Sequence, residues 1–336
     1  MRSTPFYTYE MTCDRRTVYR AVCATLCLAA VFGFAAATLA VGATNADVTI
    51  ALQTQGPRTS GPVSVSLQNE INAAVDRGRE WLLAQQNADG GWGSNSCVRL
   101  TALAGLALAR DASPDEKAAV RKAGNWLLSP AATNNLAAAD LEAQTWRELA
   151  LQVAAPADPQ RTANFRQQIL HVYAATGKAL SPFALLLIHE ATPCEFKYHF
   201  LPRDTNASPA TRILDDCIRE MPPTTLSAPS PAMHALTQLA ACWSGQDIPR
   251  CSTLGTARQY WVLAHFINRA GGGTLADEHG RVVDWRNDLA RKLVETQKVD
   301  SQKQGNGFWR SDDAPMDWAS HPVAETAFAL LALDEL

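Results

Sequence analysis

The stretch from Arg77 to Gly93, RGREWLLAQQNADGGWG, combines the end of an amphipathic helix with a glycine-rich turn. Trp81 and the apolar residues before it recur at helical spacing, which predicts one buried helix face. The segment Asp89-Gly90-Gly91 predicts a tight turn, because glycine reaches φ > 0 without steric cost. Trp92 follows the turn, and we expect this large side chain to fold back onto the helix end. Gln86, in the last turn, can hydrogen-bond free carbonyls there or N–H groups of the next helix.

A second copy of this pattern lies near the C-terminus, in residues 293–309. Gln297 stands there in the same relation to its helix as Gln86 does to the first. The tripeptide Gly307-Phe308-Trp309 repeats Gly90-Gly91-Trp92 after a longer insert. Two such matches in one chain predict a repeat architecture.

The helices that follow the two turns are also similar: TALAGLAL at 101–108 corresponds to TAFALLAL at 326–333. A third copy, KAGNWLL at 122–128, keeps the helix but has lost the glutamine and the turn. The repeat starts near 77 and 122 are about 45 residues apart, which is the length of one helical hairpin.

These features resemble the QW repeats of terpenoid cyclases of the squalene–hopene cyclase type and the related repeats of protein prenyltransferase β subunits. The resemblance implies an all-α fold, an α/α toroid in which helical hairpins form two concentric rings. The residues that carry it are Trp81, Gln86, Gly90, Trp92, Gln297, Gly307 and Trp309.

The composition agrees with a helical globular domain. Of the 336 residues, 47% are hydrophobic and 19% are charged, and alanine and leucine dominate over β-branched runs. The net charge of −3, without a basic cluster in the body of the chain, argues against nucleic-acid binding.

Eleven helical stretches are predicted, and boundaries of this kind are good to about ±3 residues. They are 68–86, 97–110, 114–128, 137–153, 159–175, 181–190, 207–220, 230–243, 253–269, 282–298 and 321–335. The helices near 97, 181 and 321 are almost wholly apolar, which predicts an inner ring, whereas those near 71, 115, 159 and 282 carry charge on one face. A closed ring of six hairpins needs twelve helices. One helix is therefore irregular or the ring is incomplete, with a helical solenoid as the alternative.

The N-terminus has the features of a targeting segment. Residues 21–43 carry no charge and are long enough to cross a bilayer, and Arg15, Arg16 and Arg20 precede them. We expect residues 1–43 to be a cleaved signal peptide or an anchor in the cytoplasmic membrane, 44–67 to be a flexible spacer, and 68–336 to be exported.

The cysteines are interpreted from this expected export, which permits disulfides. Cys242 and Cys251 bracket a polar loop and are the best candidate pair. The alternative is that all five cysteines of the body are reduced and buried. No cysteine or histidine spacing predicts a zinc site, and no cofactor is expected.

The acidic segment before the last helix is the richest candidate for chemistry. Asp317, His321 and Glu325 are the candidate catalytic residues, because a carboxylic acid in an apolar cavity keeps its proton to a higher pH. The alternative is that these acids cap a helix N-terminus and face water. Asp312 and Asp313 are candidate ligand-binding residues in the same segment.

Two further candidate ligand-binding residues, His234 and Trp146, lie on predicted helices, and Arg99 and Glu142 could line the same cavity or lie at helix ends. The Asp-x-Asp-Asp acid motif of the cyclases is absent, and Glu325 stands where the prenyltransferase zinc histidine would be. The favoured interpretation is therefore an exported binding or scaffold protein with a central groove for an apolar or extended ligand. The alternative is a divergent cyclase, or another α/α-barrel lyase or hydrolase, that uses Asp317, His321 and Glu325.

Overall fold

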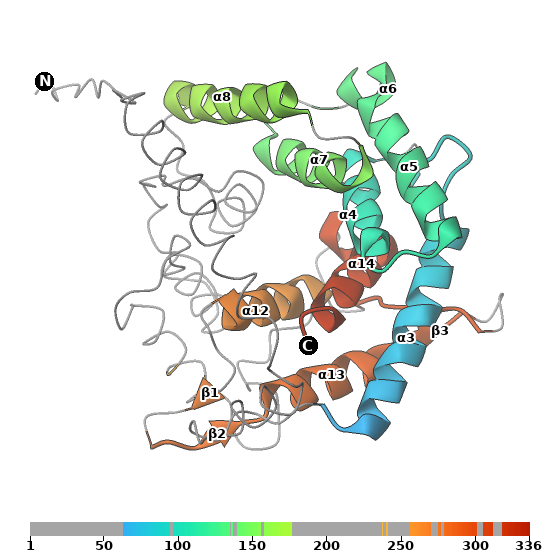
Figure 1. The fold of residues 1–336 in the computed structure, drawn as a ribbon, viewed down its shortest axis with the longest axis vertical. Coiled ribbons are helices and arrows are strands. Elements are labelled where there is room, and N and C mark those ends of the chain that lie inside the picture. Colours follow the sequence, from blue (N-terminus) through green and yellow to red (C-terminus); the bar gives the residue numbers. More distant parts are fainter. Residues whose placement is uncertain are drawn as a thin grey trace, which may run out of the picture. The chain divides into compact units, whose positions relative to one another are not determined.

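Nine α-helices account for most of the residues that the computed structural model describes (Figure 1). These residues are 63–94, 97–134, 136, 140–155, 158–176, 237, 240, 256–269, 275–276, 279–300, 305–311 and 318–336. The helices are α3 (Val65–Ala84), α4 (Val98–Ala109), α5 (Pro114–Leu128), α6 (Pro130–Asn134), α7 (Leu141–Ala154), α8 (Pro159–Thr176), α12 (Ala257–Arg269), α13 (Trp285–Thr296) and α14 (Pro322–Leu333). The prediction of a mainly helical protein is confirmed for this part of the chain.

Several helix ends follow from local sequence. The side chain of Ser113 accepts a hydrogen bond from the Glu116 amide, and Glu116 bonds back to the Ser113 amide, so that α5 begins with a complete capping box. Pro114 takes the first helical position, where its missing N–H has no consequence. Helix α7 begins at Leu141, four residues later than predicted, because the Asp140 side chain caps it.

Two short antiparallel strand pairs were not predicted. Strand β1 (Leu275–Ala276) pairs with β2 (Val282–Val283), and β3 (Lys298–Val299) pairs with β4 (Gly307–Phe308). They shorten the predicted helix 282–298 at both ends, since β2 precedes α13 and β3 follows it. A 3₁₀ turn, η1 (Trp318–Ser320), leads into α14.

Several predicted features lie outside the described residues. They include the segment 1–43, residues 44–62 of the predicted spacer 44–67, the helices 181–190 and 207–220, and most of 230–243, of which Thr237 and Ala240 are described and helical. Within the described ranges, no helix is long and apolar enough to cross a membrane.

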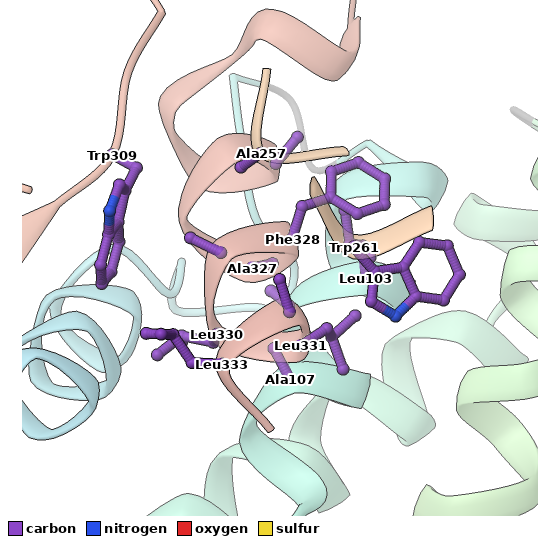
Figure 2. Packing of buried hydrophobic residues seen from close by; sticks show 14 of the residues in the cluster. Leu103, Ala107, Ala257, Trp261, Trp309, Ala327, Phe328, Leu330, Leu331 and Leu333 are labelled. Carbon is purple, nitrogen blue, oxygen red and sulfur yellow. The ribbon is translucent and has the colours of Figure 1, made fainter. Parts of the chain in front are cut away.

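Helices α4 and α14 form the centre of the packing. Every residue of α14 from Val323 to Leu333 is buried, and nine of the 12 residues of α4 are buried. Helix α4 packs against α5, α7 and α14, and α14 packs against α3, α4 and α12. Figure 2 shows Trp309 on one side of α14 and Trp261 on the other. The row α7–α4–α14–α12 is therefore an inner layer, and α3, α5 and α13 bury one face each against their neighbours.

The inner helices run parallel to one another. At their N-terminal ends, Arg99 of α4 bonds Asp140 of α7, and Glu325 of α14 accepts from the first amide of α12. At their C-terminal ends, Arg110 after α4 lies 3.4 Å from Asp334 after α14. Because N-terminal ends contact N-terminal ends and C-terminal ends contact C-terminal ends, neighbouring helices of the row run in the same direction.

The two glycine-rich turns place their tryptophans in the same way. The Trp92 indole Nε1 donates to the Leu82 carbonyl at 2.8 Å, and the Trp309 Nε1 donates to the Leu293 carbonyl at 2.7 Å. Both rings are buried, with 0% and 2% of their surface exposed. Each tryptophan thus folds back onto the helix before its turn and hydrogen-bonds one of that helix's carbonyls.

The helix after each turn supplies a threonine that completes the arrangement. The Trp92 amide donates to Thr101 Oγ1 at 3.0 Å, and the Trp309 amide donates to Thr326 Oγ1 at 3.1 Å. Both amides are buried, so the threonine hydroxyl provides the partner that a buried N–H needs. This explains why threonine opens both of the similar helical segments.

The two glutamines join each turn to the outer helix of a different repeat. Gln86 Nε2 donates to the Ala119 carbonyl of α5 at 2.9 Å, and Gln297 Nε2 donates to the Ala74 carbonyl of α3 at 2.8 Å. Ala74 and Ala119 are equivalent positions, 45 residues apart when the repeats are aligned. The C-terminal hairpin therefore joins the first hairpin as the first joins the second. Gln86 lies just past the end of α3, not in its last turn as predicted.

Glycines permit the close approaches at these joints. Gly90 has φ +97°, and a Cβ there would lie 2.7 Å from the Lys122 carbonyl oxygen of α5. A Cβ on Gly78 would lie 2.8 Å from the Trp309 ring. The joint between the first two repeats therefore needs glycine in its turn, at Gly90, and the joint of the C-terminal repeat with α3 needs glycine in the helix, at Gly78.

Truncation of either tryptophan tests this packing. We expect Trp92→Ala and Trp309→Ala each to lower the free energy of unfolding by about 3–5 kcal/mol, the range for emptying a buried aromatic site. Val282→Ala, which shortens an exposed side chain, is the control and should change it by less than about 0.5 kcal/mol. Urea denaturation measures the free energy of unfolding of all three variants. Tryptophan variants as stable as the unchanged chain would contradict the packing of Trp92 and Trp309 described above.

Candidate functional site

Polar side chains from four helices gather where the inner layer has its N-terminal ends. They are Arg99 of α4, Asp140 and Glu142 of α7, Arg258 of α12, and Glu325 of α14. Carboxylates are favoured at helix N-termini, because the aligned peptide dipoles leave partial positive charge there. The parallel inner helices thus bring residues that are distant in sequence to one end of the layer.

The pair Arg99–Asp140 holds this end together. The Nη2 atom of Arg99 donates to both carboxylate oxygens of Asp140 at 2.7 Å, and Asp140 also accepts from the Ala143 amide at 3.0 Å. The guanidinium lies 5.4 Å from the centre of the Trp318 ring, within the range of a cation–π interaction. Both side chains keep about a quarter of their surface exposed, at 27% and 28%.

Glu142 lies beside this pair. Burial raises the pKa of its carboxyl above the ordinary value, and the positive charges of Arg99 and Arg258 oppose this shift. A side-chain hydrogen bond with Trp146 also opposes the shift, and the neighbouring Arg99 Nε is buried without a hydrogen-bond partner among the described residues. Glu142 therefore has the property that the sequence analysis sought in Asp317 and Glu325, a carboxyl that keeps its proton to a higher pH.

Glu325 joins two inner helices. It is 2% exposed, and its Oε2 accepts a hydrogen bond from the Ala257 amide, the first of α12, at 2.8 Å. A carboxylate on α14 thus caps α12. Burial and the charge of Glu325 raise the pKa of the neighbouring Tyr260 to about 12.

His321 is the N-cap of α14. Its Nδ1 accepts from the Val323 amide at 3.2 Å, which requires the neutral ring with an unprotonated Nδ1. Burial also lowers the pKa of His321, so both effects favour the neutral form. The two candidate catalytic residues that the structure describes, His321 and Glu325, therefore each accept a backbone N–H at the start of an inner helix.

An aromatic cluster lies next to this polar end. Phe328 of α14 is at its centre, with ring centroids 5.7 Å from Trp261 of α12, 5.8 Å from Trp146 of α7, and 6.2 Å from Trp318. Figure 2 shows Phe328 beside Trp261. Trp146 and Phe328 are fully buried, whereas Trp318 is half-buried. The inner layer is therefore packed with aromatic side chains and is accessible at Trp318.

The remaining candidate residues lie outside the described part of the chain: Asp312, Asp313, Asp317, His234, Cys242 and Cys251. Cys97 is the one cysteine of the body that lies within the described residues, and its thiol is free. Among the described residues, no group of three or more histidine, cysteine or acidic side chains is arranged to hold a metal ion.

No protein-family model and no curated protein matches this sequence. The interpretation of the site therefore rests on its geometry.

The sequence patterns do not indicate that Asp140 and Arg258 belong to this site. The predicted helix 137–153 includes Asp140, whereas in the structure Asp140 is the N-cap of α7 and accepts from the Ala143 amide. Arg258 carries no local signal, because its proximity to Glu142 depends on the packing of α12, which lies more than 100 residues away in sequence.

The raised pKa of Tyr260 predicts a pH dependence of stability. Below about pH 10 the phenol is neutral in both states and its contribution is fully present. From pH 10 towards 12 the unfolded chain loses the proton while the folded chain retains it, so the free energy of unfolding falls. We expect Tyr260→Phe to remove part of this alkaline loss, on the order of 1–3 kcal/mol at about pH 11.5. Urea denaturation between pH 9 and 11.5 measures the free energy of unfolding. If it falls equally steeply with pH in the unchanged chain and in Tyr260→Phe, the raised pKa of Tyr260 is contradicted.

Proposed function

We propose that residues 68–336 form an α/α toroid of helical hairpins in two concentric rings, exported behind the N-terminal segment. We further propose that the protein acts as a binding or scaffold protein, with a central groove for an apolar or extended ligand and no bound cofactor. The resemblance to terpenoid cyclases and prenyltransferases concerns the repeats and does not extend to their catalytic motifs.

The equivalence of the two glutamine joints supports the toroid. In an open solenoid, the last repeat has no reason to contact the first. Here Gln297 bonds α3 as Gln86 bonds α5, and α13 and α14 both pack against α3. The same joint thus links consecutive repeats and also links the last repeat to the first, as a closed ring requires.

Substitution of the glutamines tests closure. We expect Gln86→Leu and Gln297→Leu to lower the free energy of unfolding by similar amounts, about 1–3 kcal/mol each, because each removes two hydrogen bonds of a half-buried side chain. Gln85→Leu, at an exposed neighbouring position, is the control. A loss for Gln86→Leu together with a neutral Gln297→Leu would support an open solenoid.

The engagement of Glu325 by the α12 amide carries the proposal of binding without catalysis. A carboxylate that caps a helix is held in place by its acceptor role, and His321 has a similar role in α14. By contrast, α7, α12 and α14 together form an aromatic cluster, which is suited to contact with an apolar body. Trp318 extends this cluster to the accessible end of the layer.

An extended apolar probe tests the binding proposal. We expect 1,6-diphenylhexatriene to bind the full chain with a saturable rise in fluorescence, and Trp318→Ala to weaken binding at least about tenfold. Leu128→Ala removes an exposed apolar side chain from the outer helix α5 and should leave the affinity unchanged. Non-saturable binding, or equal loss in both variants, would contradict a groove at Trp318.

The alternative, an enzyme that uses Asp317, His321 and Glu325, gives a different result with Glu325→Gln. In a binding protein, the glutamine amide oxygen can still accept from Ala257, so the melting temperature and probe affinity should stay close to those of the unchanged chain. In an enzyme, the unchanged chain would convert an added polyprene to new products and Glu325→Gln would not. Mass spectrometry of the recovered polyprene distinguishes the two.

A further inference from the structure

The C-terminal end of the chain is held by two side chains of α12. Glu335 Oε1 lies 2.8 Å from His265 Nδ1, and Asn268 Nδ2 donates to Glu335 Oε2 at 3.0 Å and also to the Glu335 carbonyl. Leu336, the last residue, packs against the hydrophobic core. Because α14 ends at Leu333, these contacts hold the chain just beyond the end of the central helix.

The pair His265–Glu335 is shielded from water but keeps a carboxylate. The two side chains are 11% and 14% exposed. Burial opposes the shift, but the hydrogen bonds from His265 and Asn268 lower the pKa of the Glu335 carboxyl below its ordinary value. Glu335 therefore stays ionised near neutral pH, the range in which a histidine gains or loses its charge. The protonation of His265 decides whether a charged or a neutral ring faces this carboxylate.

Protonation of His265 strengthens the contact. A protonated ring makes a charge-assisted hydrogen bond with Glu335, which is about twice as strong as a neutral one. A neutral ring leaves a mostly buried carboxylate without a counter-charge in contact, and an uncompensated buried charge is unfavourable. Burial of the imidazole opposes its protonation, but the carboxylate 2.8 Å away supplies the opposite charge that offsets this effect.

The sign of the pH dependence follows. The closed C-terminal end holds a proton on His265 more tightly than an end that has opened into water. The stabilisation of the closed end is therefore fully present below about pH 6.5, the ordinary value for histidine, and is lost as the pH rises above it.

Other charged groups around this end come from several elements. Among the residues that the structure describes, Arg286 of α13 donates to Asn268 Oδ1 at 3.1 Å, and Arg110 after α4 lies 3.4 Å from Asp334. Both arginines keep their charge near neutral pH. Burial raises the pKa of Asp334, against the charges of two arginines and together with those of two acids: Arg110, Arg79, Asp111 and Glu335. Protonation of Asp334 therefore also favours the folded chain as the pH falls.

His321 at the other end of α14 acts in the opposite direction. Its Nδ1 caps α14 only when the ring is neutral, and burial lowers its pKa. Acidification therefore weakens the N-terminal end of α14 while it strengthens the contact of His265 with Glu335. Because these two effects oppose each other in the total stability, a test must measure the C-terminal end locally.

We propose that His265 and Glu335 form a pH-sensitive latch, in which the protonated His265 ring holds the C-terminal end of the chain on α12 and loss of that proton loosens it. This inference does not depend on the ligand proposed above. Since α14 packs against α3, α4 and α12, the latch sets how firmly the inner layer is closed at its C-terminal end.

Hydrogen exchange of the full chain tests the latch, with mass spectrometry of the C-terminal peptide as the readout. The amides of Asp334, Glu335 and Leu336 donate to carbonyls of α14, so their protection reports how often this end opens. After correction for the intrinsic pH dependence of exchange, we expect protection at least about threefold greater at about pH 5.5 than at about pH 8.

Two variants assign the effect to the pair. Glu335→Gln keeps an acceptor but removes the charge, and His265→Asn keeps a donor that does not titrate. In both we expect the difference in protection between the two pH values to disappear. His279→Asn replaces an exposed histidine between β1 and β2, and as the control it should behave like the unchanged chain. Circular dichroism confirms that each variant is folded.

Several outcomes would overturn the proposal. Equal protection of the unchanged chain at both pH values would show that the latch does not respond to pH. Greater protection at about pH 8 would show that burial of the His265 ring outweighs its carboxylate partner. A pH difference that persists in Glu335→Gln and His265→Asn, or that disappears in His279→Asn, would show that another group is responsible.

Discussion

The arrangement of the described helices depends on one hydrogen bond, made twice, from a tryptophan indole N–H to a carbonyl of the helix that the chain has just left. This bond turns the chain back on itself after a glycine-rich turn, and the threonine of the next helix then pairs the tryptophan amide. Because the bond adds a donor to a carbonyl near a helix end and buries a large ring at once, a short sequence specifies a complete hairpin. The glutamine after the same helix then donates a hydrogen bond to a carbonyl of the neighbouring hairpin.

Local sequence patterns predict most of these helices. Apolar periodicity placed α3, α4, α5, α13 and α14, and the Ser113–Glu116 capping box lies within four residues. The strand pair β3–β4 has no such signal, because two residues are too few to show a period. The role of Glu325 could not be predicted either, since its partner, the Ala257 amide, is 68 residues away and depends on how α12 and α14 pack.

The parallel inner layer accounts for the chemistry of the site. When helices run in the same direction, their N-termini and partial positive charges collect at one end, and carboxylates gather there as caps and ion-pair partners. Asp140, His321 and Glu325 each accept a backbone N–H in this way. Glu142 lies among them, and burial raises the pKa of its carboxyl, while Arg99, Arg258 and a side-chain hydrogen bond with Trp146 oppose this shift.

The central claim is that the last repeat joins the first through the same joint as consecutive repeats. A double-mutant cycle between Arg77 of α3 and Gln297 after α13 tests it most directly, because Arg77 Nε donates to Gln297 Oε1 at 2.9 Å across 220 residues of sequence. The account predicts a coupling free energy of about 0.5–1.5 kcal/mol between Arg77→Met and Gln297→Leu in urea denaturation. Strict additivity of the two substitutions would contradict the joint.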